Sequence, residues 1–231
     1  MTLAIMQPYF MPYIGYWQLL AAADVFILYD NIQYTKKGWI NRNRFLLNGG
    51  DSLFTVPVKK DSDFLNVVER KVADDFNRVK LINQFRANYR KAPCFETVFP
   101  LVTSIIRFED RNLFEYIYHS IRLTAAFLQI RTPITISSTI TMDHSLRGAD
   151  KVIALCKAMG ADAYINPIGG QELYSKTVFD SHGLALNFIK TRPVSYQQFG
   201  YNFVPNLSII DVMMFNSKDA IQAMLDAYDL V

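Results

Sequence analysis

The sequence contains little of the chemistry that marks metal and redox sites. It has two cysteines, Cys94 and Cys156, which lie far apart, and three histidines in 231 residues. Neither cysteine belongs to a pair with metal-ligand spacing, so the sequence supports neither a structural zinc site nor a disulfide framework. The HExxH, GxSxG and Walker A patterns are also absent, which argues against a zinc peptidase, a serine hydrolase and a P-loop enzyme.

Long apolar runs and a strong excess of one charge are missing as well. No window approaches about 18 uncharged apolar residues, so we expect no membrane span. Residues 1–6 are too short for a signal peptide and lack its basic lead, so we expect a cytoplasmic protein. The formal net charge of +3 is far below that of a dedicated nucleic-acid binder but is compatible with a local anion site.

Apolar residues, in contrast, are plentiful at 51% of the chain, enough for a substantial core. Residues 2–6 predict a buried strand, the segment that begins at Ile14 predicts a helix, and residues 25–30 predict a second strand. Continuous apolar strands joined by a helix are typical of a parallel sheet that is covered on both faces. The chain is therefore expected to begin with a βαβ unit.

The rest of the sequence also predicts an α/β fold. Two strand-like runs around Asn48 and Gly49 predict a β-hairpin, and residues 74–130 read as helical. Strands and helices alternate again after Thr132, and residues 217–230 close the chain with a helix-like pattern. We predict one α/β domain over residues 1–231, with a mostly parallel sheet, helices on both faces, a β-hairpin and a helical insertion at 74–130.

Four unusual segments follow predicted strands: QPYFMPYIGY, DNIQYTKKGWINRNR, SSTITMDHSLRG and NPIGG. Ligands of open α/β sheets bind outside the carboxyl ends of the strands, so these segments are expected to share one rim. Ordinary loops are the alternative, although all four are rich in polar, aromatic or glycine residues.

The first segment places Gly15 on the first turn of a helix, where a ligand can approach the backbone and an anion is attracted. Tyr13 and Tyr16 flank it with a spacing that can direct both rings at one ligand. The alternative is that these tyrosines only pack over the sheet.

The second segment combines an aromatic ring with cations. Trp39 lies close to Arg42 and Arg44, which alternate like strand residues and should share a face. Such a cluster suits a phosphate, a carboxylate or a stacked base. For Lys36 and Lys37, in contrast, a solvated face is the simpler interpretation.

Three residues are candidates for proton transfer. His144 lies in a polar loop, unlike the other histidines, and is a candidate general base, with an ordinary exposed loop residue as the alternative. Asp30 follows the second strand and is a candidate partner for a metal, a hydroxyl group or Arg42. Tyr16 is the third candidate.

The predicted binding residues combine amides, hydroxyls, aromatic rings, cations and glycines. Backbone N–H groups near Gly15 or near Gly169 and Gly170 are suited to stabilise an oxyanion. The full set is Gln7, Tyr13, Gly15, Trp39, Arg42, Arg44, Ser138, Asn166, Gly169 and Gly170.

Four motifs in order resemble the WbqC-like protein family: MQPYFMPYIGYWQL, GWINRNR, ADAYINPIGGQELY and FVPNLSIIDVMMFN. The resemblance covers nearly the whole chain. It implies a role in the biosynthesis of bacterial O-antigen or another surface polysaccharide. For some members of the family, attachment of an amino acid such as glycine to an amino sugar has been suggested.

A second resemblance concerns the segment from Pro12 to Tyr16, which is similar to the signature of the HIGH superfamily. That group includes class I aminoacyl-tRNA synthetases, cytidylyltransferases and pantothenate synthetase, and its signature also follows the first strand and opens a helix. Here YIGY keeps Gly15 but has tyrosines in place of both histidines. Tyrosine donates a hydrogen bond but does not carry an imidazolium charge, and no KMSKS-like segment follows, so the use of ATP stays open.

Together, the resemblances imply a transferase or ligase that joins an amino acid such as glycine to the amine of a nucleotide-linked amino sugar. The carboxyl group would be activated by ATP or supplied as an aminoacyl-tRNA. The diphosphate of the sugar nucleotide would account for Arg42 and Arg44. The alternatives are a non-catalytic module that binds a nucleotide sugar or tRNA, and a nucleotidyltransferase; a homodimer is compatible with the sequence.

Overall fold

The structure is a computed structural model, and it describes residues 1–200 and 202–231. Within these residues, a six-stranded sheet has the order β5-β2-β1-β6-β7-β8. The five strands from β5 to β7 are parallel and β8 is antiparallel, which confirms the predicted mostly parallel sheet. The strands are β1 (Thr2–Met6), β2 (Val25–Leu28), β5 (Ile134–Ile136), β6 (Ala163–Pro167), β7 (Ala185–Thr191) and β8 (Tyr228–Leu230).

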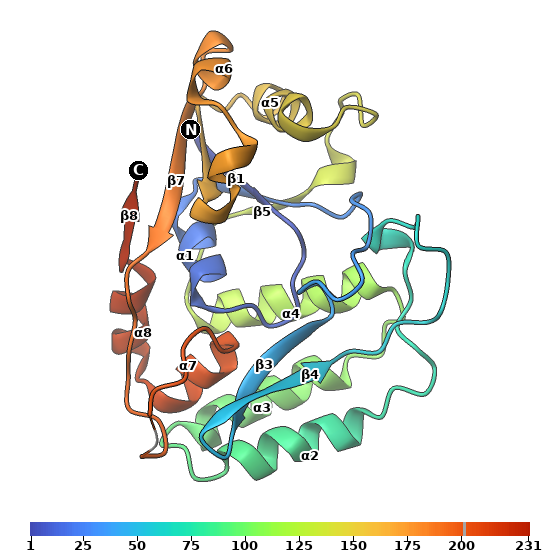
Figure 1. Cartoon of the computed structure of the whole chain (residues 1–231). Helices are drawn as coiled ribbons and strands as arrows, with labels where there is room; N and C mark the ends of the chain where they lie inside the picture. Colours follow the sequence, from blue (N-terminus) through green and yellow to red (C-terminus); the bar gives the residue numbers. More distant parts are fainter. Residues whose placement is uncertain (201) are drawn as a thin grey trace.

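Helices cover both faces of this sheet, as predicted (Figure 1). Because side chains alternate along a strand, β1 contributes to two separate clusters. Leu3 and Ile5 pack with residues of α5 and α6, whereas Ala4 packs with residues of α1 and α8. These helices are α1 (Ile14–Ala22), α5 (Gly148–Ala158), α6 (Lys176–Ser181) and α8 (Lys218–Leu225).

The predicted hairpin is a separate two-stranded sheet formed by β3 (Arg42–Leu47) and β4 (Gly50–Thr55). Its turn residues Asn48 and Gly49 both have positive φ angles, of 50° and 79°, which suits the twist of a two-residue hairpin turn. Asn–Gly is therefore the dipeptide that this turn favours.

Helices fill most of residues 74–130, and Figure 1 shows them with the hairpin below the large sheet. Their apolar residues belong to the same cluster as those of α1 and α8, so the hairpin, these helices and one sheet face share a core. The remaining elements are α2 (Arg78–Tyr89), α3 (Phe95–Arg107), α4 (Leu113–Phe127), α7 (Ile209–Phe215) and the short 3-10 helices η1 (Val67–Glu69), η2 (Ser137–Thr139) and η3 (Ile168–Leu173).

The end of the chain differs from the prediction. The helix-like pattern over residues 217–230 holds only to Leu225, after which the chain forms β8. Leu230 pairs with Ile189 of β7, and this distant partner decides the conformation. None of the helices in the described residues has the length and apolar character needed to cross a membrane.

Candidate functional site

The large sheet reverses its winding between β1 and β6. From β1 the chain adds β2 and β5 on one side, and after α5 it adds β6 and β7 on the other. Such a reversal leaves a crevice outside the carboxyl ends of the two central strands. The cavity found there, of about 370 Å³, is called the switch-point cavity. It is lined by Ile5, Met6, Gln7, Tyr9, Tyr29, Ile32, Val152, Tyr164, Asn166, Pro167, Gly169, Gly170, Leu173 and Tyr174.

Four tyrosines give this cavity its aromatic character: Tyr9, Tyr29, Tyr164 and Tyr174. Burial raises the pKa of each hydroxyl group, and it raises the pKa of Tyr29 to about 12. The hydroxyl groups are therefore protonated near neutral pH and can both donate and accept hydrogen bonds.

The end of β6 brings an amide to the cavity, and the segment after it brings a pair of glycines. A Cβ atom on Gly170 would collide with Nδ2 of Asn166, so glycine at this position leaves room for the asparagine. The Tyr164 hydroxyl donates a 3.1 Å hydrogen bond to Oδ1 of Asn166 and fixes this side chain. Around Gly169, in contrast, a Cβ atom would meet nothing within 4 Å, so its backbone is open to approach.

Gln7 follows β1 and supplies the amide on the opposite side of the switch point. Its Oε1 accepts a hydrogen bond from the Tyr9 hydroxyl at 3.2 Å. Its backbone oxygen accepts another from the Tyr16 hydroxyl at 3.0 Å. The chain that leaves β1 is thus held in place by two tyrosines.

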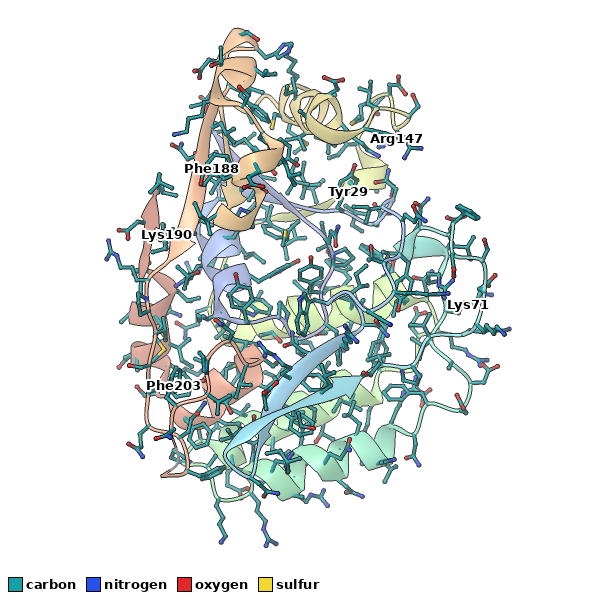
Figure 2. The ribbon with its side chains drawn as sticks, viewed as in Figure 1. Tyr29, Lys71, Arg147, Phe188, Lys190 and Phe203 are labelled. Atoms are coloured by element: carbon teal, nitrogen blue, oxygen red, sulfur yellow. The ribbon has the colours of Figure 1, made fainter. Side chains whose placement is uncertain are left out.

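Two cations lie beside the cavity, close to Tyr29. Lys151 is buried in the first turn of α5, with its Nζ 4.9 Å from the centre of the Tyr29 ring. Burial, followed by the nearby charge of Arg147, lowers the pKa of Lys151. Arg147 also opposes the rise in the pKa of Tyr29, and Figure 2 shows it at the start of α5. This end of the cavity is therefore suited to an anion.

A second cavity, of about 290 Å³, is lined by Tyr9, Pro12, Tyr13, Trp39, Asn43, Arg44 and Asn206 and is called the Trp39 cavity. The guanidinium carbons of Arg42 and Arg44 lie 5.8 and 5.5 Å from the centre of the Trp39 ring, so the two arginines share a face. Arg42 donates to the carbonyl oxygens of Gly38 and Lys37.

Arg44 is anchored on two sides. Its Nη1 lies 3.3 Å from a carboxylate oxygen of Asp51, and its Nη2 donates to the carbonyl oxygen of Asn206 at 3.2 Å. Its Nε is buried and has no hydrogen-bond partner among the described residues.

The YIGY segment forms the start of α1. Tyr13 is the N-cap residue, and its ring covers Gly15. A Cβ atom on Gly15 would lie 2.6 Å from the Tyr13 ring, so the space left by this glycine is filled by a tyrosine of the same segment. Tyr16 points into the core, and only 2% of its surface is exposed. The two tyrosines therefore face different surroundings.

Asp30 is buried immediately beyond β2 and anchors the segment after β5. Its Oδ1 accepts hydrogen bonds from the Ser137 hydroxyl at 2.7 Å and from the backbone N–H of Ser138 at 2.9 Å. The side chain of Ser138 is exposed.

His144 has a partner at each ring nitrogen. Its Nδ1 lies 2.9 Å from Nδ2 of Asn31, and its Nε2 lies 2.9 Å from the carbonyl oxygen of Ile140. Since an amide nitrogen donates and a carbonyl oxygen accepts, this arrangement corresponds to a neutral ring with the proton on Nε2. Lys151 donates to the backbone oxygen of His144 at 3.2 Å and completes the connection to α5.

The structure divides the predicted residues among four places. The switch-point cavity contains Gln7, Asn166, Gly169 and Gly170. Tyr13, Trp39 and Arg44 line the Trp39 cavity, and Arg42 lies beside its indole ring. Asp30, Ser138 and His144 lie in the loops after β2 and β5, and Gly15 and Tyr16 are buried in α1.

Several site residues are absent from the sequence-based prediction. Tyr9, Tyr29, Tyr174, Arg147 and Lys151 lie at or beside the switch-point cavity. For Lys151 a signal was present, because it occupies the apolar face of a predicted helix, where an unpaired lysine is uncommon. Tyr174 follows the short helix η3, and its spacing carries no comparable signal.

Comparison with known proteins shows one family. The model of the WbqC-like protein family matches residues 7–223. The chain is also similar to "Uncharacterized protein Rv1507c" of Mycobacterium tuberculosis, with 28% identity over 220 residues that cover 92% of each chain. No solved structure matches. The family match includes every residue that lines the two cavities except Ile5 and Met6.

Proposed function

The chain belongs to the WbqC-like protein family, and from this membership together with the cavity geometry we propose a transferase or ligase of surface-polysaccharide biosynthesis. Its proposed reaction joins an amino acid such as glycine to the amine of a nucleotide-linked amino sugar. The observation that carries the proposal is the switch-point cavity, with its tyrosines, its two amides and the cations beside it.

The lining suits a sugar. Pyranose rings present hydroxyl groups around an apolar face. The side chains of Gln7 and Asn166 can hydrogen-bond to the hydroxyl groups, and tyrosine rings can cover the apolar face. The open backbone of Gly169 lets a substrate approach within contact distance of the chain.

A linked diphosphate would lie toward the cations. Lys151 lies over the Tyr29 ring and the charge of Arg147 acts on the Tyr29 hydroxyl, so both provide positive charge at one side of the cavity. Arg42 and Arg44, for which the resemblance implies a role at the same diphosphate, flank the neighbouring Trp39 cavity instead.

The reaction requires a base for the sugar ammonium group and a donor for the developing oxyanion. Backbone N–H groups near Gly169 are proposed as the oxyanion donors. Asp30, Tyr16 and His144 stay candidates for proton transfer. The hydrogen bonds of His144 must rearrange before its ring can accept a proton, because Nδ1 is occupied by Asn31.

The proposal is tested by incubating the protein with glycine, ATP and a panel of UDP- and dTDP-linked amino sugars. A second arm replaces ATP and glycine by glycyl-tRNA, and mass spectrometry detects the new amide. We expect product with at least one sugar, and an Asn166→Ala variant should lose most of it, whereas Asn88→Ala on α2 should not. Binding of a sugar nucleotide without product in either arm would instead support the non-catalytic module.

A further inference from the structure

One side chain belongs to both cavities. Tyr9 lines the switch-point cavity and the Trp39 cavity, so its ring is a common wall. The ring is held by Tyr16, whose ring centre lies 5.9 Å away, and by its hydrogen bond to Gln7. Ligands in the two cavities would therefore both contact Tyr9.

Each cavity also has its own cations. Lys151 lies over the Tyr29 ring at the switch-point cavity and the charge of Arg147 acts on the Tyr29 hydroxyl, whereas Arg42 and Arg44 flank Trp39. A single nucleotide-linked sugar carries one diphosphate, and one set of cations suffices to hold it. Two sets at two adjoining cavities fit two anionic ligands, as a transfer between two substrates requires.

We propose that the Trp39 cavity binds the nucleoside 5′-phosphate of the activated acyl donor, so that donor and amino sugar meet at Tyr9. This assignment rests on the proposed function for the identity of the reaction. It goes further in naming the chemical class of the second substrate and the residues that hold it.

The side chains of the Trp39 cavity match a nucleoside phosphate. The indole of Trp39 is 41% exposed and offers a face on which a base can stack. Arg44 supplies positive charge beside it and has a buried Nε without a partner among the described residues. Burial raises the pKa of Tyr13, so its hydroxyl group is a hydrogen-bond donor near neutral pH.

In the proposed step, the sugar amine attacks the acyl carbon of a carboxylic–phosphoric anhydride or of an ester on the nucleoside. A C–N bond forms, and the acyl C–O bond breaks with its electron pair going to the leaving oxygen. The amine loses one proton to a base as the amide forms. An anhydride donor leaves a phosphate anion beside Arg44, whose charge compensates it, whereas the leaving oxygen of an ester donor takes up a proton and becomes a hydroxyl group.

The test uses adenosine monophosphate as the probe, because both ATP-derived and tRNA-derived donors end in this unit. Of the two tryptophans, Trp17 is fully buried and out of reach of a ligand. A base that stacks on Trp39 should therefore quench the fluorescence of Trp39 alone. Calorimetric titration of Arg44→Gln and Trp39→Leu should show affinity for the probe reduced about tenfold or more. The matched control is Arg122→Gln, which removes a guanidinium group 5.7 Å from the centre of another aromatic ring, that of Tyr118.

The same variants are titrated with the dTDP- or UDP-linked amino sugar. We expect its affinity to change less than about twofold, since Arg44 and Trp39 do not line the switch-point cavity. Arg44→Gln also removes the contacts to Asp51 and Asn206. If that variant does not fold, Trp39→Leu carries the test, because the Trp39 side chain makes no hydrogen bond to any described residue. A comparison of ATP with a short RNA that ends in CCA separates the two donor sources.

The inference is overturned if the wild-type protein does not bind adenosine monophosphate at millimolar concentration. It is also overturned if both variants lose affinity for the sugar nucleotide but bind the probe as tightly as the wild type does. The latter result would support the sequence-based assignment of Arg42 and Arg44 to the sugar diphosphate. If the probe binds as expected but no sugar nucleotide binds, the proposed function fails while the nucleoside-phosphate site stands.

Discussion

The ring of Tyr13 rests on Gly15, and this contact makes a small residue decisive for the shape of the Trp39 cavity. A methyl group at residue 15 would displace the Tyr13 ring but suits the helix itself, where alanine is more favourable than glycine by about 1 kcal/mol. We expect Gly15→Ala to keep the melting temperature within a few degrees of the wild type. In calorimetry it should bind adenosine monophosphate several-fold more weakly. An unchanged affinity for the probe would mean that the position of Tyr13 is irrelevant to binding.

His144 illustrates how a sequence can place a residue without revealing its partners. Its polar loop predicts a base, but the structure shows contacts at both ring nitrogens, with Asn31 and Ile140. If His144 only stabilises the fold through these hydrogen bonds, His144→Ala should lower the free energy of unfolding by about 1–3 kcal/mol. The pH dependence of turnover should then keep its shape. Loss of an acid-limb inflection, together with a turnover lowered about a hundredfold, would identify His144 as the base.

At the scale of elements, Asp211 connects parts of the chain that pattern alone does not join. Its Oδ2 accepts from the Tyr89 hydroxyl at 2.8 Å, and its Oδ1 accepts from Tyr196 at 2.6 Å and from Nε2 of Gln198 at 2.7 Å. Tyr89 in turn accepts from the backbone N–H of Leu46 at 2.9 Å. The fully buried carboxylate therefore ties α7 to α2, to the hairpin and to the segment after β7.

Removal of this carboxylate should be costly. Asp211→Ala leaves buried donors without an acceptor, each at about 1–3 kcal/mol, so we expect the free energy of unfolding to fall by about 3 kcal/mol or more in urea denaturation. Asp226→Ala, at the end of α8, serves as the control. A loss below about 1 kcal/mol would show that water replaces the carboxylate.

The buried carboxyl group of Asp211 also predicts how the free energy of unfolding depends on pH. Burial raises the pKa of Asp211 above its unfolded value, although three hydrogen bonds oppose the rise. A carboxyl group with a raised folded pKa contributes stability that is complete below its unfolded pKa and is lost as the pH rises through the folded one. The free energy of unfolding of the wild type minus that of Asp211→Asn should therefore decrease as the pH rises above about 4, the pKa of an aspartate in the unfolded chain. An increase over this range would contradict the assignment.

Local signals predicted some elements well and others poorly. The Asn–Gly turn determines the hairpin because both residues adopt positive φ angles there. Strand β8 was missed, since its residues continue a helix-like pattern and its partner Ile189 lies about 40 residues earlier. Sequence periodicity reports the local face of an element but not a distant strand that pairs with it.

For the whole molecule, the order of strands matters most, because it brings Gln7 and Asn166 to one crevice. The sequence predicted that both residues follow strands of one sheet. It could not predict that Tyr9 would separate two cavities or that Lys151 would lie over Tyr29, since both depend on packing between distant segments.

The central claim, a site for a nucleotide-linked amino sugar at the switch point, is tested most directly by filling that cavity. Gly169 lines the cavity, and a Cβ atom there would meet nothing within 4 Å, whereas Gly50 is an exposed strand glycine that does not belong to the lining. Calorimetry should show that UDP- or dTDP-linked amino sugars bind the wild type and Gly50→Val equally and bind Gly169→Val at least about tenfold more weakly. Equal binding to Gly169→Val, or no binding to the wild type by any sugar of the panel, would contradict the account.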